Sequence, residues 1–283
     1  MLQLMHKERM IKSMAKMFKT RPFVSERPWG YELWTLSTHR SGQSEVLPSG
    51  ENLLEYLGSP LPILIKVIKA NEPLSVQVHP DDAYANKYEN DNGKTECWYI
   101  LEAEEGAKLI AGIKPGYDRE SMKKIIDEGR LEEVMEYIPV KAGDMVYIPA
   151  GTVHAIMGGL KLFEVQQSSD STYRMYDWGR DREMHIEKSL DVIDYEGKNK
   201  PGKIDHFKVL ETPYFNVEKV VCKDHVNGIV SSPFETINIC KRSGRIVSDE
   251  DGQEIEFVPE DTIYIPQGLK YTVEGDVEYL RTY

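Results

Sequence analysis

The stretch DMVYIPAGTVHAI at residues 144–156 has a counterpart, DTIYIPQGLKYTV, at residues 261–273. The two stretches share the first Asp, the Tyr-Ile-Pro sequence and the Gly two residues after the Pro, at a constant offset of 117 residues. Such self-similarity is typical of a repeated architecture, so we predict two copies of one β-supersecondary unit. The copies differ where His154 corresponds to Tyr271. We therefore interpret the shared frame as structural and His154 as a feature added to the first copy.

Outside these two stretches, most of the sequence consists of short β-rich runs broken by Gly, Pro, Asn and Asp. This pattern is typical of a β sandwich or barrel. Together with the repeat, it predicts a mainly β fold: a double cupin (β jelly roll) with one catalytic half and one degenerate half. The strands expected in the first half are Ile63–Ile68, Leu74–Val78, Cys97–Leu101, Lys108–Ala111, Met145–Ile148 and Leu160–Gln166.

Three segments have the character of helices rather than strands. Residues 118–137 carry apolar residues at helical spacing on both sides of Gly129, which predicts a small insertion of two short helices. A short helix is expected over Asp81–Glu89, and Glu183–Tyr195 is amphipathic. We therefore expect helices to accompany the β core without replacing it.

The expected domain organisation has three parts. Residues 1–17 form a basic, Met-rich leader or arm without the apolar core of a signal peptide. A catalytic cupin domain follows over residues 18–197, and a polar linker leads to a cupin-like domain over residues 204–283 that lacks metal ligands. No stretch approaches the roughly 20 apolar residues that a membrane span requires.

The bulk composition restricts the function classes. The formal net charge of the 283 residues is −12, which argues against a nucleic-acid binder, because phosphate backbones are held by basic surfaces. The three cysteines are scattered and form no CxxC pair, as expected of a reduced, cytoplasmic protein. The sequence leaves monomer and homodimer open as assembly states.

Three separate segments carry residues suited to bind a metal ion. Gln77 and His79 are two residues apart in an expected strand, so both face the same side, with Val76 and Val78 expected to face the opposite sheet. Zinc accepts His nitrogen and carboxylate oxygen, and catalytic sites keep one position open. Each candidate alone has an ordinary explanation as surface polarity or a loop contact. Taken together, Gln77, His79, Glu96 and His154 predict a single metal site.

The chain resembles the short-form type I mannose-6-phosphate isomerases, which are zinc enzymes of the cupin superfamily. The resemblance runs from about Arg27 to about Asp194, and the C-terminal third resembles the family's second cupin-like half weakly. Its blocks are IKVIKANEPLSVQVHPDD from Ile65, GKTECWYIL from Gly93, VKAGDMVYIPAGTVHAI from Val140 and EVQQSSDSTYRMYDWGR from Glu164.

The resemblance implies roles for individual residues. It implies one zinc ion per chain, held by the four residues just named as metal ligands. The family's catalytic arginine corresponds to Arg174, and further active-site positions correspond to Ser75, Lys66, Lys94 and Asp170. The implied reaction interconverts mannose 6-phosphate and fructose 6-phosphate through a cis-enediol, so the implied partner is a small phosphorylated sugar, not a nucleic acid or a membrane.

The chemistry leaves several assignments open. Arg174 suits either the enediolate oxygen or the substrate phosphate, because a guanidinium stays charged and presents a planar donor fork. Lys94 lies two residues before Glu96 and is the preferred general base, although Lys66 or Lys94 also suits a phosphate. Asp170 lies four residues before Arg174 and is a candidate to orient it. The other histidines, including His39, lack such a setting, and we interpret them as ordinary polar positions.

Two other functions remain as alternatives. Two histidines and a carboxylate also satisfy the requirements of an Fe(II) cupin oxidoreductase. A cupin that binds a sugar phosphate without catalysis is the second alternative. Basic residues around the metal, namely Lys66, Lys94 and Arg174, favour a phosphorylated substrate that is not oxidised.

Overall fold

The computed structural model describes residues 16–283, and these divide into two compact units, each containing two β sheets. We call them the N-terminal unit and the C-terminal unit and describe each by itself. The N-terminal unit comprises Pro22–Gln43 and Leu57–Phe207, and the C-terminal unit comprises residues 16–21, Ser44–Tyr56 and Lys208–Tyr283.

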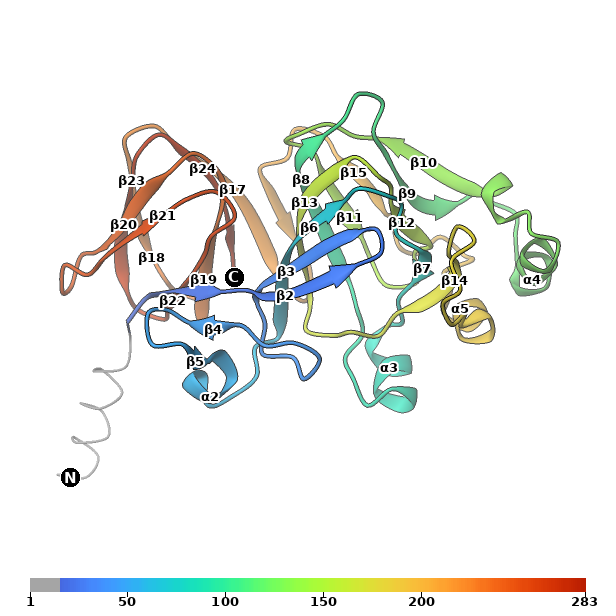
Figure 1. Cartoon of the computed structure of the whole chain (residues 1–283), viewed down its shortest axis with the longest axis horizontal. Helices are drawn as coiled ribbons and strands as arrows, with labels where there is room; N and C mark the ends of the chain where they lie inside the picture. Colours follow the sequence, from blue (N-terminus) through green and yellow to red (C-terminus); the bar gives the residue numbers. More distant parts are fainter. Residues whose placement is uncertain (1–15) are drawn as a thin grey trace. The chain divides into compact units, whose positions relative to one another are not determined.

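The N-terminal unit is built on a seven-stranded and a five-stranded sheet, with strand orders β15-β11-β8-β13-β6-β3-β2 and β10-β9-β12-β7-β14 (Figure 1). All of their strand pairs are antiparallel. The strands are β2 (Phe23–Arg27), β3 (Gly30–Leu36), β6 (Ile63–Ala70), β7 (Val76–Val78), β8 (Glu96–Ala103), β9 (Lys108–Ile113), β10 (Met135–Pro139), β11 (Met145–Ile148), β12 (His154–Ile156), β13 (Leu160–Gln167), β14 (Tyr173–Tyr176) and β15 (Gly202–Ile204).

Alternation along the strands separates two apolar clusters in this unit. One cluster lies between the sheets and includes Trp98 and Leu162 of the larger sheet with Ile156 of the smaller one. The other lies on the opposite face of the smaller sheet and includes Val76 and Val78. The expectation that these two valines face the opposite sheet is therefore wrong. They pack beneath helices, which leaves the neighbouring inward positions of β7 to polar residues.

Helices cover that outer face. They are α3 (Asp82–Tyr88), α4 (Arg119–Asp127) and α5 (Ile186–Val192). Helix α4 begins at a capping box in which Asp118 accepts the backbone N–H of Ser121. Its buried residues Met122 and Ile125 join Leu190 of α5 in the outer cluster.

Most of the expected elements of this unit are present, with one correction. The six expected strands and the helix expected over Asp81–Glu89 are observed. The second helix expected after Gly129 is absent: only a short 3₁₀ turn, Leu131–Glu133, precedes strand β10. Gly129 adopts a left-handed conformation (φ 68°) that ends α4, and Met135 then pairs with Ile113 of β9 and is buried.

The C-terminal unit has an eight-stranded and a four-stranded sheet, with strand orders β16-β17-β24-β19-β22-β1-β4-β5 and β18-β23-β20-β21. Its apolar core lies between them and includes Ile237 and Ile263 of the larger sheet with Val273 of the smaller one. The elements are β1 (Phe18–Arg21), β4 (Glu45–Val46), β5 (Glu51–Asn52), α2 (Leu53–Leu57, ending at the unit boundary), β16 (Val209–Glu211), β17 (Asn216–Cys222), β18 (His225–Ile229), β19 (Phe234–Lys241), β20 (Gly244–Ser248), β21 (Glu254–Phe257), β22 (Thr262–Pro266), β23 (Lys270–Glu274) and β24 (Val277–Thr282).

The division of the chain differs from the predicted domain boundaries. Strand β1 pairs with β22, with Phe18 opposite Tyr264, so the residues predicted to open the catalytic domain belong to the C-terminal unit. Met17 is buried in the same core, although it was predicted to end the leader. Residues 1–15 of that leader lie outside the described residues. Because strand pairing joins segments far apart in sequence, a linear boundary missed these contributions.

The repeat found in the sequence corresponds to a real structural repeat. In the N-terminal unit it forms β11 in one sheet and β12 in the other, and in the C-terminal unit it forms β22 and β23 in the same relation. The mainly β double cupin is confirmed. Within residues 16–283, no helix has the length and apolar character needed to cross a membrane.

Candidate metal centre and active site

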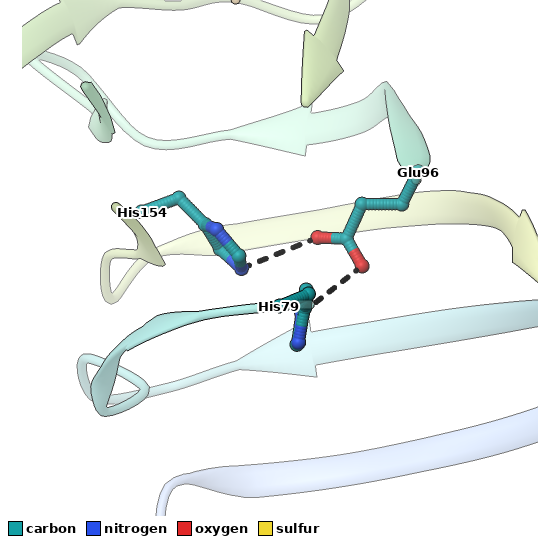
Figure 2. A group of neighbouring side chains, drawn as sticks. All are labelled: His79, Glu96 and His154. Carbon is teal, nitrogen blue, oxygen red and sulfur yellow. Dashed lines mark ion pairs between the residues drawn. The ribbon is translucent and has the colours of Figure 1, made fainter. Parts of the chain in front are cut away.

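Two histidines and a glutamate from both sheets of the N-terminal unit meet inside it. Glu96 is the first residue of β8, His154 is the first residue of β12, and His79 directly follows β7. All three are buried, and one ligand atom from each lies within 4.8 Å of the others. Figure 2 shows the three side chains pointing toward one another. Among residues 16–283 this is the only such group of His, Cys, Asp or Glu side chains.

The hydrogen bonds of the two imidazoles fix their tautomers. The Nδ1 of His79 lies 2.9 Å from the carbonyl oxygen of Ser171, and that of His154 lies 2.8 Å from the carbonyl of Thr152. A carbonyl only accepts, so each Nδ1 carries the hydrogen and each Nε2 presents a lone pair. This is the arrangement in which metal-binding histidines are usually held.

Lone pairs converge at this point without enough donors to satisfy them. The Nε2 of His79 and of His154 each lie 3.4 Å from one carboxylate oxygen of Glu96. His79 Nε2 and both Glu96 oxygens are buried and accept no hydrogen bond from the described residues. Buried acceptors left in this way are costly, and a cation would satisfy all of them. The residues present therefore fit a metal ion.

The electrostatics prepare these groups as ligands. Burial, reinforced by the charge of Lys94, lowers the pKa of His79 to about 3, and burial also lowers the pKa of His154. Burial alone would raise the pKa of Glu96, but Lys94 and then His79 outweigh it and hold that pKa well below its usual value. At neutral pH the site thus presents two neutral imidazoles and one carboxylate.

Gln77 lies beside this group, as the strand alternation predicts. It pairs directly with His154 across the sheet, and its Nε2 lies 3.3 Å from Nε2 of His154. Its Oε1 accepts a hydrogen bond from the hydroxyl of Ser75 at 3.3 Å. The structure therefore brings together all four predicted ligand residues, with the amide next to the place where the imidazoles and carboxylate meet.

The other predicted active-site residues line one cavity, together with the predicted ligand Gln77. The cavity has a volume of about 280 Å³. Arginines that the sequence analysis did not single out, Arg27 and Arg182, also line it, as does Glu32. The predicted residues in its wall are Ser75, Gln77, Lys66, Lys94, Asp170 and Arg174.

The two lysines of the cavity are both buried and paired. Lys94 Nζ lies 3.3 Å from Oε2 of Glu96, and Lys66 Nζ lies 2.9 Å from Oε1 of Glu164. Burial would lower the pKa of Lys66, but the charges of Glu164 and Glu32 raise it above the ordinary value. Lys66 is therefore held as a cation whose charge is compensated, whereas Lys94 contacts the carboxylate of the candidate metal ligand.

Arg174 differs from the lysines because no carboxylate pairs with it among the described residues. It lies opposite Gln77 in the sheet, and its Nη1 donates to the carbonyl of Glu183 at 2.6 Å while its Nε is buried without a partner. Burial and the nearby charge of Arg182 lower its pKa. The guanidinium thus bonds to a backbone carbonyl rather than to Asp170, which was considered as its orienting partner.

Glu164 is the most prominent cavity residue that the sequence analysis missed. Besides pairing with Lys66, it accepts a hydrogen bond from Nε1 of Trp98 at 3.0 Å. Glu164 and Lys66 lie directly opposite each other on β13 and β6. A signal was present in the sequence: Lys66 and Glu164 are each the single charged residue at an inward position of an apolar run.

The C-terminal unit has a glutamate at the position that corresponds to Glu96. In the N-terminal unit Glu96 lies opposite Ile148, and in the C-terminal unit Glu235 lies opposite Ile265. Ile148 and Ile265 are the same position of the sequence repeat. Glu235 is therefore the counterpart of Glu96, and the carboxylate survives in the half that was predicted to lack metal ligands.

The partner of that carboxylate has changed. Tyr271, the counterpart of His154, is buried and donates its hydroxyl to Glu235. Gly228 lies opposite Tyr271 where Gln77 lies opposite His154, so the amide is also missing. A hydroxyl–carboxylate bond thus occupies the place that the imidazole–carboxylate group occupies in the N-terminal unit.

Glu235→Gln is expected to change how stability depends on pH. Burial raises the pKa of Glu235, although the Tyr271 hydrogen bond opposes this. When a carboxyl has a higher pKa in the folded state than in the unfolded state, the free energy of unfolding falls as pH rises from the unfolded pKa through the folded pKa. In urea unfolding, the free energy of unfolding of Glu235→Gln minus that of the wild type should therefore rise by on the order of 1 kcal/mol between pH 5 and pH 8. An equal difference at both pH values, or the same trend in an exposed control, Glu250→Gln, would contradict this.

The chain forms two β sandwiches on one repeated β unit, and candidate ligand side chains point into the interior of one of them. These features define a protein of the cupin class. A family model described as phosphomannose isomerase type I, catalytic domain, matches residues 9–108. The mannose-6-phosphate isomerase of Streptococcus mutans is 34% identical over 283 residues, which covers 89% of this chain and 88% of that protein. The chain belongs to this family of isomerases.

Solved structures agree with this assignment. The crystal structure of the mannose 6-phosphate isomerase from Bacillus subtilis superposes with a TM-score of 0.86 at 26% identity, covering 94% of this chain and 99% of that one. A mannose 6-phosphate isomerase bound with zinc and yttrium shares the fold, with a TM-score of 0.70 at 15% identity over 95% and 99% of the two chains.

Proposed function

We propose that this enzyme interconverts mannose 6-phosphate and fructose 6-phosphate through a cis-enediol, with one Zn²⁺ held by Gln77, His79, Glu96 and His154. The observation that carries the proposal is the convergence of two imidazole lone pairs and a carboxylate lacking hydrogen-bond donors, beside a cavity rich in cations. The relatives named as mannose-6-phosphate isomerases support the choice of substrate.

The donor set favours zinc. Two imidazoles, one carboxylate and an amide oxygen are ligands that Zn²⁺ accepts while it keeps a further position open. Gln77 would join through Oε1 after a half-turn of its amide, because oxygen and not nitrogen coordinates. When bound, the ion polarises a carbonyl or hydroxyl oxygen of the substrate.

Lys94 is the proposed proton carrier. The reaction moves one proton from C2 to C1 of the sugar and another between their two oxygens. Lys94 Nζ would take the proton from one carbon and return it to the other. Its 3.3 Å contact with Glu96 places it at the end of the cavity where the ligands converge. Lys66, held charged by Glu164 and Glu32, is a poorer base.

Arg174 and Arg182 supply further positive charge in the wall of that cavity. Arg174 has no carboxylate partner among the described residues, and Arg182 lines the same wall. An uncompensated guanidinium beside a second one favours an anion. It would stabilise the enediolate oxygen or bind the substrate phosphate, and the kinetic test in the Discussion separates these roles.

The direct test of the function combines metal analysis with activity. We expect about one zinc per chain, isomerisation of fructose 6-phosphate, loss of turnover with a chelator, and recovery with added Zn²⁺. The reaction should continue without oxygen, whereas an Fe(II) oxidoreductase would stop. A sugar-phosphate-binding cupin would show affinity without exchange of the C2 proton with solvent, and that result would refute the enzyme proposal.

The cellular compartment is part of the same proposal. All three cysteines are buried and unpaired, which supports a reducing compartment such as the cytoplasm. A disulfide-dependent stability of the purified protein would argue against it.

A further inference from the structure

The carbonyl that orients His79 belongs to a loop with little regular structure. Ser171 lies between β13 and β14, and its carbonyl oxygen accepts the Nδ1 hydrogen of His79 at 2.9 Å. Asp170, its neighbour, lines the active-site cavity. The orientation of the imidazole therefore depends on what holds this loop in place, because no ladder of strand hydrogen bonds does so.

Asp91 holds the loop from a second segment of the chain. Its Oδ2 accepts the backbone N–H of Asp170 at 3.1 Å and the hydroxyl of Ser171 at 3.4 Å. Its Oδ1 accepts the N–H of Asn92 at 2.9 Å, which fixes the carboxylate to its own turn. The side chain of Asp91 is only 10% exposed, so water does little to satisfy it.

The same two segments are joined at two further points. Asn92 donates its side-chain amide to the carbonyl of Ser168 at 3.0 Å, and Ser169 donates its hydroxyl to the carbonyl of Asn92 at 2.7 Å. The Asn92–Ser168 bond does not reach Ser171, whereas the Ser169 hydroxyl also accepts the backbone N–H of Ser171 at 3.2 Å and so gives the loop a second support. Of the two side chains at residues 91 and 92, Asp91 is the one that bonds to Asp170 and Ser171. The carbonyl of Ser171 is the group that bonds to His79.

The ring of His39 contacts the same carboxylate oxygen. The backbone N–H of Ser41 donates to Nδ1 of His39 at 3.2 Å, so Nδ1 is unprotonated and the hydrogen of the neutral ring lies on Nε2. That Nε2 is 3.4 Å from Oδ2 of Asp91, and the His39 side chain is 8% exposed. His39, interpreted from sequence as an ordinary polar position, is a buried partner of Asp91.

We propose that Asp91 is a positioning residue for the metal centre: its carboxylate fixes the loop at Asp170 and Ser171, and the Ser171 carbonyl then holds the His79 ring with Nε2 directed at the metal position. The inference rests on the proposed function, since it requires the site to bind a divalent cation. Groups that orient a metal-bound histidine typically contribute 10- to 100-fold to metal affinity or activity. Because Asp91 acts through one intervening carbonyl, we expect about a 10-fold effect.

Asparagine is the informative replacement because it keeps the shape and removes the chemistry. Two hydrogen bonds, from the backbone N–H of Asp170 and the hydroxyl of Ser171, reach one oxygen of Asp91, which the His39 ring also contacts. An amide offers one oxygen, and its NH₂ group is a donor only. Asp91→Asn can turn its NH₂ toward those donors, which breaks their bonds, or keep its oxygen there and turn NH₂ toward the N–H of Asn92. The second orientation breaks the bond that fixes the side chain to its own turn, so the anchor of the loop is weakened in both cases.

The experiment measures cobalt binding to the full-length protein, with and without the substitution. Chelator competition gives the Kd for Co²⁺, and the visible absorption of the bound ion reports its coordination geometry. We expect Asp91→Asn to raise the Kd about 10-fold and to shift the absorption band. The matched control is Asp118→Asn at the start of α4, where Asp118 also accepts a backbone N–H but does not contact the site. Asparagine also caps a helix well, so this variant controls for the Asp-to-Asn change itself and should leave both readouts unchanged.

A second variant keeps the test decisive if Asp91→Asn folds poorly. Ser171→Ala removes one hydroxyl bond to Asp91 and leaves the carbonyl in place, so a smaller rise in Kd is expected in the same direction. An unchanged Kd and spectrum in a folded Asp91→Asn protein, or in Ser171→Ala where only that variant folds, would overturn the inference while the proposed function stands. Wild-type protein that binds no Co²⁺ or Zn²⁺ would overturn the proposed function and this inference with it.

Discussion

Replacing His154 with tyrosine is expected to reduce metal binding from about one ion per chain to none while the protein stays folded. The substitution removes one imidazole ligand and installs the residue found at the same position of the repeat. Tyr271 donates its hydroxyl to Glu235 in the C-terminal unit, so a tyrosine at residue 154 can donate to Glu96 in the same way. Metal analysis after dialysis measures the loss, and circular dichroism with thermal unfolding measures the fold.

A matched control separates the loss of this ligand from the loss of any histidine. His225 is exposed on β18 of the C-terminal unit and pairs with Asp224, and it is not part of the ligand group. His225→Gln should keep full metal content and turnover. Full zinc stoichiometry in His154→Tyr, or collapse of the fold, would contradict the assignment of His154 as a ligand in a frame that tolerates tyrosine.

Arg174→Lys is expected to lower kcat about 100-fold with unchanged metal content. Removing one preorganised donor from a developing oxyanion typically costs 10²–10³ in rate, and an ammonium cannot reproduce the planar fork of a guanidinium. Arg174 lies opposite Gln77 and its Nε has no partner among the described residues. Steady-state kinetics in both directions, with zinc quantified for each preparation, measure the effect.

The division between kcat and KM distinguishes the two roles left open for Arg174. A loss confined to kcat means that the guanidinium acts mainly in the transition state, whereas a rise in KM with unchanged kcat means that it binds the substrate uniformly, as a phosphate anchor would. Arg182→Lys is the comparison, because Arg182 lines the same cavity but pairs with Asp177. Unchanged kcat and KM in Arg174→Lys would remove Arg174 from the active site.

The fold was predictable where local pattern determines it. Short alternating runs gave the strands, and the repeat at residues 144–156 and 261–273 correctly predicted two related halves. Pairing between distant segments was not predictable in this way. Strand β1 joins the C-terminal unit through β22, and nothing in its four residues indicates that partner.

The helical insertion shows a second limit of local reasoning. Apolar residues at helical spacing continue past Gly129. The segment after it is nevertheless stabilised as a strand, because it pairs with β9 and buries Met135. Tertiary pairing thus overrode the periodic pattern. The same reason explains why Val76 and Val78 pack under the helices of the outer face rather than against the other sheet.

The candidate site was predictable to the extent that its residues stand in short patterns. Gln77 and His79 share a face by strand alternation, and His154 stands out against Tyr271 of the repeat. Glu164, Asp91 and His39 were missed because their importance arises from pairing across sheets and loops, which no local pattern records. For Arg174 the structure provides a backbone carbonyl as partner, where sequence proximity had suggested Asp170.

The central claim is that one cation binds among Gln77, His79, Glu96 and His154. Anomalous diffraction from crystals of the zinc-loaded protein, recorded on both sides of the zinc absorption edge, tests it most directly. We predict a single strong peak about 2.0–2.2 Å from Nε2 of both imidazoles and from a Glu96 oxygen, the distances that zinc makes to such ligands. An active, zinc-containing crystal with its peak elsewhere, or with none among these residues, would contradict the account.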